Sequence, residues 1–312
     1  AAGDNLAIGQ QAAAANLSGY HLTSIGHYSL LANTSAQGNT AVGHSSLRTT
    51  TTGAANTAVG KQSLCKTTTG GNNVALGYAA LCTNTTGANN IAVGYDALVT
   101  NSTGQFNTAV GSYSLDANTT ANYNVAVGMN AMGSNTTGCC STGVGVDSLK
   151  GNTIGFCNIG IGRGAGCNLT EGDNNIALGV LAGTDAVGNL VTSNNFIVIG
   201  NNSHTNAKIK IDWTVTSDLR DKTNFGIVPH GLNFVNQLEP ISFQFKKSRE
   251  NDTPTGDVRY GFKAQDIMAL EGENPVIIDN RDTENLGYTA GNMVPVLVNA
   301  IKELKARIEV LE

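Results

Sequence analysis

The sequence predicts a mostly β protein in which a long solenoid of stacked repeats is followed by a small α+β domain that ends in a coiled-coil helix. Three observations predict this fold class. Glycine recurs every 17 residues over more than half of the chain. Charged residues make up 13% of the 312 residues, roughly half the usual share, and aromatic residues only 5%. The final residues instead repeat apolar side chains at heptad spacing.

A glycine marks each repeat. Steps of 17 residues from Gly9 meet glycine at all eleven positions as far as Gly179, which chance does not explain at a usual glycine share of about 7%. The marks between them are Gly26, Gly43, Gly60, Gly77, Gly94, Gly111, Gly128, Gly145 and Gly162. A unit of 17 residues is too short to bury its own apolar side, so we expect the units to stack.

Three columns keep their place relative to the marks. The residue before each mark is aliphatic, from Ile8 to Leu178, and a second apolar column, from Leu30 to Leu149, lies four residues after the marks. Asparagine recurs four residues before them, at Asn39, Asn56, Asn73, Asn90, Asn107 and Asn124. We expect short strands such as Asn-Thr-Ala-Val-Gly, Thr-Thr-Gly turns, burial of both apolar columns and an asparagine ladder. The composition disfavours the alternative, a helical repeat.

The repeats resemble the head repeats of trimeric autotransporter adhesins and the repeats of phage tail-fibre-like proteins. The resemblance rests on the Asn-x-Ala-Val-Gly and Ser-Leu or Ala-Leu signatures and covers residues 5–179. It implies that this 17-residue-repeat β-solenoid, or β-roll, forms the shaft of a homotrimer.

The shaft offers little for catalysis or metal binding. Between positions 5 and 170 its only acidic residues are Asp96, Asp116 and Asp147, and the two that share a column lie three rungs, about 14 Å, apart. Glycoside hydrolysis needs two carboxylates about 5–9.5 Å apart, so we expect no turnover enzyme in the shaft. His27 and His44 share a column, but a structural metal site usually needs four ligands, so we expect neither metal nor cofactor.

Cysteines also follow the period. Cys65 and Cys82 are 17 residues apart, as are Cys140 and Cys157, so each pair should lie on neighbouring rungs about 4.8 Å apart. This spacing suits an inter-rung disulfide in an extracellular particle. The alternative is a pair of small buried thiols, because a particle assembled in a reducing cytoplasm need not oxidise.

The period ends after Gly179. Residues 180–194 have the composition of a loop, and residues 195–200 return as a final strand. The composition then shifts toward charge, and all five prolines lie beyond residue 228. We therefore expect a fibre shaft over residues 1–200, a connector over 201–216 and a separate domain over 217–312.

Four ordered sequence blocks occupy this last domain. They are TSDLRDKTN (216–224), GLNFVNQLEP (231–240), YGFKAQD (260–266) and AIKEL (300–304). The blocks resemble those of the endosialidase-type intramolecular chaperone family, whose first block contains the pattern Ser-Asp-x-Arg-x-Lys-Thr. The resemblance implies a homotrimeric chaperone that folds the upstream β-structure and then cuts the chain between Thr216 and Ser217. It further implies Ser217 as nucleophile and Lys222 as general base, with Asp218 and Arg220 shaping the site.

The chemistry of these residue types agrees with a Ser–Lys pair. A serine hydroxyl needs a base to attack a peptide carbonyl, and a buried lysine can supply a neutral amine. A Cys–His pair is excluded, because the domain has one histidine, His230, and no cysteine. A five-residue spacing places Ser217 and Lys222 on opposite faces of a strand, or about 140° apart on a helix. We therefore expect the dyad to form through a turn or between protomers.

A heptad seam runs along the last predicted helix, at about residues 292–312. Its members are Val294, Leu297, Ile301, Leu304, Ile308 and Leu311. The seam predicts association of this helix, while the number three comes from the family resemblance alone.

Together these features predict the C-terminal part of a trimeric phage-type tail fibre, acting outside the cell on a virion or phage-like particle. The expected partners are further copies of the chain, an upstream fibre or baseplate protein, and a cell-surface glycan or protein receptor. The alternatives are a bacterial cell-surface trimeric adhesin with the same chaperone and, third, a glycan-degrading tailspike. A net charge of −5 argues against nucleic-acid binding, and no apolar run approaches the ~20 residues of a membrane span.

Overall fold

The computed structural model describes residues 3–185, 188–204, 217–281, 283 and 286–311. Contacts within the chain divide it into two compact units, residues 1–201 and 202–312, which are described separately. Thr216 and most of the predicted connector lie outside the described residues.

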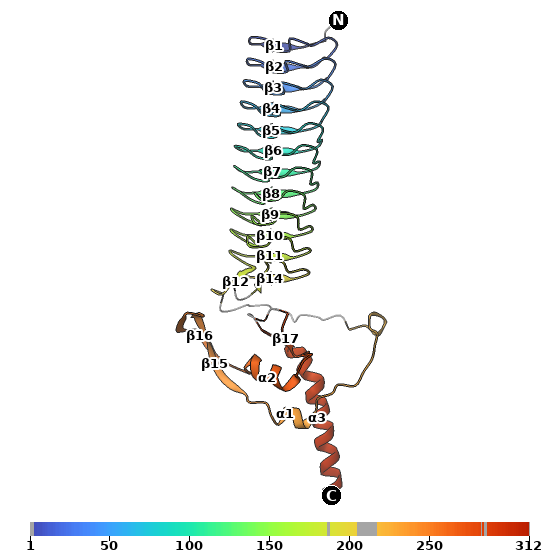
Figure 1. The fold of residues 1–312 in the computed structure, drawn as a ribbon, viewed down its shortest axis with the longest axis vertical. Helices are drawn as coiled ribbons and strands as arrows, with labels where there is room; N and C mark the ends of the chain where they lie inside the picture. Colours follow the sequence, from blue (N-terminus) through green and yellow to red (C-terminus); the bar gives the residue numbers. More distant parts are fainter. Residues whose placement is uncertain (1–2, 186–187, 205–216, 282, 284–285, 312) are drawn as a thin grey trace. The chain divides into compact units, whose positions relative to one another are not determined.

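The first unit is a β-solenoid with one short strand per rung, stacked in chain order (Figure 1). Twelve strands form one parallel sheet, in which each strand pairs with the next along the chain, so that Ala41 lies opposite Ala58 and Ala58 opposite Ala75. The strands are β1 (Leu6–Ile8), β2 (Thr23–Ile25), β3 (Thr40–Val42), β4 (Thr57–Val59), β5 (Val74–Leu76), β6 (Ile91–Val93), β7 (Thr108–Val110), β8 (Val125–Val127), β9 (Thr142–Val144), β10 (Ile159–Ile161), β11 (Ile176–Leu178) and β14 (Ile197–Ile199). The predicted solenoid of 17-residue repeats is confirmed.

The marked glycines end the strands, where the chain turns sharply against the next rung. Gly77 has a φ of 137°, and a Cβ placed on it would lie 2.3 Å from the carbonyl oxygen of Gly94. Gly94 meets Gly111 in the same way, at 2.5 Å. Only glycine avoids both the backbone strain and the clash, which explains the strict recurrence of this residue.

Alanine and leucine columns fill the interior. The middle residue of most strands is alanine, and Ala58, Ala75 and Ala92 are fully buried. The second apolar column is also buried, as predicted, with Leu47 and Leu64 both fully inaccessible. These leucines have φ values of 46° and 48°, a left-handed conformation that is unfavourable for a leucine and that burial in the core must offset.

The predicted asparagine ladder is present. The Nδ2 atoms of Asn73, Asn90 and Asn107 each donate to the Oδ1 atom of the asparagine one rung earlier, at 3.1–3.2 Å. Each also donates to a backbone carbonyl, as Asn90 does to Gly104 at 2.8 Å. A second buried ladder, not predicted, joins the side chains of Asn84, Asn101, Asn118, Asn135 and Asn152.

The prediction that the aliphatic column before the marks is buried was wrong. Val59 is 39% exposed, and Ile161 45%. The physical reason is the alternation of a β-strand: because the middle residue points into the core, both its neighbours point outward. Stacking of the rungs therefore leaves this column on the outer face of the sheet.

The insertion at 180–194 is more ordered than its composition indicated. It contains β12 (Thr184–Asp185) and β13 (Gly188–Asn189), which pair antiparallel. The strand β14 then returns to pair with β11 in parallel and completes the twelfth rung.

The second unit has an α+β core. Its elements are η1 (Leu219–Asp221), α1 (Leu232–Val235), β15 (Ile241–Ser248), β16 (Asn251–Gly261), α2 (Ala264–Glu271), β17 (Ile278–Asp279), β18 (Gly287–Tyr288) and α3 (Ala290–Leu311). Strands β15 and β16 form an antiparallel hairpin, and Phe234, Ile267, Ile278, Met293 and Val296 are buried together. Helix α3 spans nearly the range predicted for the terminal helix.

Candidate functional site

Ser217 and Lys222 meet within one chain. The Nζ atom of Lys222 donates a hydrogen bond to the Oγ atom of Ser217 at 2.6 Å. The intervening residues form the single 3-10 turn η1, so the pair is joined through a turn, the first of the two routes considered from the five-residue spacing.

Asp218 begins this turn. Its carboxylate accepts from the backbone N–H of Arg220 at 2.8 Å, while the backbone N–H of Lys222 closes the turn on the carbonyl of Leu219 at 3.2 Å. The backbone is extended at Asp218 and again at Lys222. An aspartate at an N-cap followed by one tight turn therefore returns the lysine side chain to the serine.

Arg220 holds the same carboxylate from its side chain. Its Nη2 atom lies 2.6 Å from Oδ2 of Asp218, and its Nε atom 3.0 Å from Oδ1. The guanidinium lowers the pKa of Asp218 below its ordinary value, and the carboxylate raises that of Arg220. The charge of Asp218 is thus engaged by Arg220, and Lys222 donates to the hydroxyl of Ser217.

The site is open to solvent in the single chain. Ser217, Arg220 and Lys222 are exposed, and Asp218 is half-buried. A lysine accepts a proton only as a neutral amine, and burial favours that form. The geometry of a nucleophile and a base is thus present, whereas the burial that would activate the base is not supplied by one copy of the chain.

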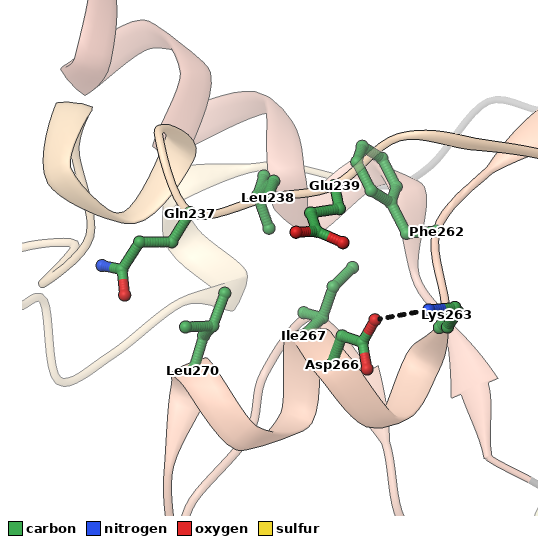
Figure 2. A pocket seen from close by; sticks show the side chains of 8 residues that line it. All are labelled: Gln237, Leu238, Glu239, Phe262, Lys263, Asp266, Ile267 and Leu270. Atoms are coloured by element: carbon green, nitrogen blue, oxygen red, sulfur yellow. Dashed lines mark ion pairs between the residues drawn. The ribbon is translucent and has the colours of Figure 1, made fainter.

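The second and third sequence blocks meet around a hollow of about 410 Å³ (Figure 2). In Figure 2, Leu238 and Glu239 face Ile267 and Leu270 of α2 across this hollow. Lys263 forms an ion pair with Asp266 at 3.5 Å on its rim. The described lining residues include no nucleophile paired with a base.

The other candidate residues lie in the solenoid. The rings of His27 and His44 are neighbours, with centroids 5.3 Å apart. Asp147 lies 3.4 Å from Lys150 and accepts a hydrogen bond from Asn130. Within the described residues, no three potential metal ligands form a cluster.

The cysteine columns are stacked as the period predicts, and all six cysteines are free thiols. The thiols of Cys65 and Cys82 are hydrogen-bonded across neighbouring rungs, and this bond lowers the pKa of Cys65 to about 7. The Sγ atoms of Cys139 and Cys140 lie 3.4 Å apart.

Comparison with known proteins places the C-terminal stretch in a family. Residues 217–275 match the model of the family described as chaperone of endosialidase, so the chain carries an endosialidase-type chaperone domain there. No curated protein and no solved structure matches the chain. Among the helices of the described residues, none combines the length and the apolar character that a bilayer crossing requires.

Besides the second asparagine ladder, two further features of the structure were not predicted from the sequence. The exposure of the outer face of the solenoid sheet was not predicted, because a repeat period shows which residues align between rungs but not which way their side chains point. The carboxylate of Glu271 accepts three backbone N–H groups, from Val276, Ile277 and Ile278, at 2.8–3.0 Å. A glutamate shortly before an irregular segment carries no signal of that role in the sequence.

Proposed function

We propose that residues 217–312 are an intramolecular chaperone that assembles three copies of the chain, guides folding of the solenoid and then detaches by autoproteolysis between Thr216 and Ser217. The observation that carries the proposal is the 2.6 Å contact between Lys222 Nζ and Ser217 Oγ, in a stretch that matches the chaperone family.

The chemistry is an acyl transfer followed by hydrolysis. The Oγ atom of Ser217 attacks the carbonyl carbon of Thr216 while the neutral amine of Lys222 takes the hydroxyl proton. The C–N bond to Ser217 breaks, and Lys222 returns the proton to the released amine. Water then cleaves the resulting ester, which leaves a carboxylate on Thr216 and restores the hydroxyl of Ser217.

Exposure of the dyad couples this chemistry to assembly. In a single chain the side chain of Lys222 is exposed to solvent. Packing of neighbouring copies over the site would desolvate the amine and so activate it. Under this proposal, cleavage follows correct assembly and acts as a check on it.

The solenoid explains why a chaperone is needed. Its twelve parallel strands pair only across 17 or more residues, and such non-local pairing is slow and leaves apolar surface exposed before it is complete. A template that aligns several chains reduces the entropy cost of the first rungs. Removing the template afterwards would trap the folded shaft kinetically.

We assign the whole to a phage-type tail fibre whose shaft acts in structure or host adhesion on an extracellular particle. A β-solenoid shaft followed by an endosialidase-type chaperone supports this assignment. The partners would be an upstream fibre or baseplate protein and a glycan or protein receptor on the host surface.

Two variants test the proposal. The wild-type chain should yield pieces of 216 and 96 residues, whereas Ser217→Ala should stay whole and still assemble, and the control Ser203→Ala should be cut like the wild type. Residues 1–216 produced alone should be insoluble. A soluble assembled shaft from that shortened chain would remove the chaperone role, and cleavage of Ser217→Ala would remove the nucleophile.

A further inference from the structure

The outer face of the solenoid sheet is a continuous apolar surface. It consists of the first and last residues of the twelve strands, which we call the aliphatic stripe. Its members are Leu6, Thr23, Thr40, Thr57, Val74, Ile91, Thr108, Val125, Thr142, Ile159, Ile176 and Ile197 at the strand starts, and Ile8, Ile25, Val42, Val59, Leu76, Val93, Val110, Val127, Val144, Ile161, Leu178 and Ile199 at the strand ends. Exposure reaches 42% at Ile91 and 68% at Ile197.

The stripe is uncharged along its whole length. Every strand end is aliphatic, and the strand starts hold only aliphatic residues and threonine. The basic residues of the repeats, Arg48, Lys61, Lys66, Lys150 and Arg163, all lie in other columns. Ten of its members are large hydrophobic side chains with exposures of 37–68%, and they extend from the first strand to the last. Soluble single chains rarely leave an apolar patch of this extent uncovered.

We propose that the aliphatic stripe is the surface through which copies of this chain pack against one another, parallel and rung by rung. The inference rests on the proposed function, which requires several chains to assemble.

Charge and periodicity identify the occupant as another copy. The stripe carries no charge that could complement a charged partner. The stripe of another copy is also uncharged, so the two surfaces can pack without electrostatic repulsion. The rungs repeat about every 4.8 Å, so side chains interdigitate over the full length only with a surface of the same repeat. A helix, which rises about 1.5 Å per residue, does not share this repeat, and another copy of the twelve-rung solenoid does.

The threonines favour parallel packing. In a parallel arrangement each rung is level with the same rung of its neighbour, so threonines lie level with threonines. Reversal would bring Thr23 level with Ile176 and Thr40 level with Ile159, which presses hydroxyl groups against aliphatic side chains.

The second unit carries an uncovered seam of its own. The predicted heptad residues of α3 are exposed, with Leu297 at 41%, Leu304 at 48% and Ile301 at 66%. Each unit taken separately therefore presents an apolar surface that the single chain leaves open, and self-association covers both.

Site-specific photo-cross-linking tests the stripe in the full chain. The photoreactive residue p-benzoylphenylalanine replaces Val127 on the stripe or, as the control, Thr120, which is exposed in another column of the same repeat. Irradiation should join chains through position 127, with the attachment mapped to β8 or an adjacent rung of another copy, and should leave the control as single chains. Cross-links from position 120 alone, or attachments mapped to rungs in reversed order, would overturn the proposal.

Charge substitution gives an independent readout. The double variant Leu76→Lys/Val127→Lys should lose the assembled state in sedimentation, whereas Thr69→Lys/Thr120→Lys should keep it. An assembled stripe variant would contradict the inference, and if that variant is insoluble the cross-linking result decides. A wild-type chain that is never cut would count against the proposed self-cleaving chaperone and not against packing through the stripe. The two hypotheses are therefore tested by different measurements.

Discussion

Glu303 on α3 caps the start of α1, where its Oε2 atom accepts a hydrogen bond from the backbone N–H of Leu232 at 2.9 Å. The two residues are 71 positions apart, and they join the second and fourth sequence blocks of the chaperone domain. Asn299, one helical turn earlier, donates to the carbonyls of Val228 and His230, which ties the same segment to α3. The terminal helix thus organises the chain that leads from the candidate site, in addition to presenting its seam.

Replacing Glu303 by alanine should loosen this junction. Loss of a carboxylate cap costs about 1 kcal/mol, so amide exchange over residues 231–236 should accelerate about fivefold in hydrogen–deuterium exchange of the full chain. The control is Glu309→Ala, which removes only an exposed pair with Lys305 and should leave that peptide unchanged. Equal exchange in both variants would show that the cap does not hold α1.

The marked glycines should not tolerate a side chain. Gly94→Ala forces alanine into a φ of 144° with its Cβ 2.5 Å from the carbonyl oxygen of Gly111, and should cost at least about 2 kcal/mol. The control is Gly38→Ala, because its nearest neighbour is 3.9 Å away and Ala55 occupies the same column at a φ of 57°. Thermal unfolding of the two variants compares them directly, and equal midpoints would contradict the explanation of the repeat.

The asparagine ladder should contribute to stability through satisfied buried groups. Asn90→Ala leaves the buried backbone N–H of Asn107 without its acceptor and removes one of the two amide groups that donate to the carbonyl of Gly104, at a cost of about 2 kcal/mol. Asn89→Ala is the matched control, because Asn89 is exposed and shares its column with Ala55. Denaturant unfolding should separate the two, and a loss of similar size in Asn89→Ala would rule out the ladder as the cause.

Cys65 should react as a thiolate near neutral pH. The Cys82 thiol stabilises the charged form and lowers the pKa of Cys65 to about 7, so alkylation should rise through pH 7 and level off above it. Cys167, whose pKa burial raises, should react only at higher pH. Mass spectrometry after brief iodoacetamide treatment reads both sites. In Cys82→Ala the Cys65 profile should move up toward pH 9, and an unmoved profile would exclude the hydrogen bond as its cause.

Sequence periodicity predicted much of the solenoid, because stacked rungs must repeat their residues in register. The column of Leu47 and the ladder of Asn73 were both predicted correctly for this reason. The direction of Val59 was not, because a three-residue strand is too short for its alternation to appear beside a 17-residue period. At the candidate site the family resemblance implied Ser217 and Lys222, and the chemistry of the residue types agreed with it. The turn that joins them depends on the cap made by Asp218, which spacing alone does not reveal.

The central claim is that the chain cuts itself at the Ser217–Lys222 pair, and a comparison of freshly produced wild type with Lys222→Ala tests it most directly. Intact-mass measurement of the wild type should find pieces of 216 and 96 residues, the smaller beginning at Ser217, and the variant should remain a single chain of 312 residues. Cleavage of Lys222→Ala at the wild-type rate, or a correctly folded wild type that stays whole, would contradict the account.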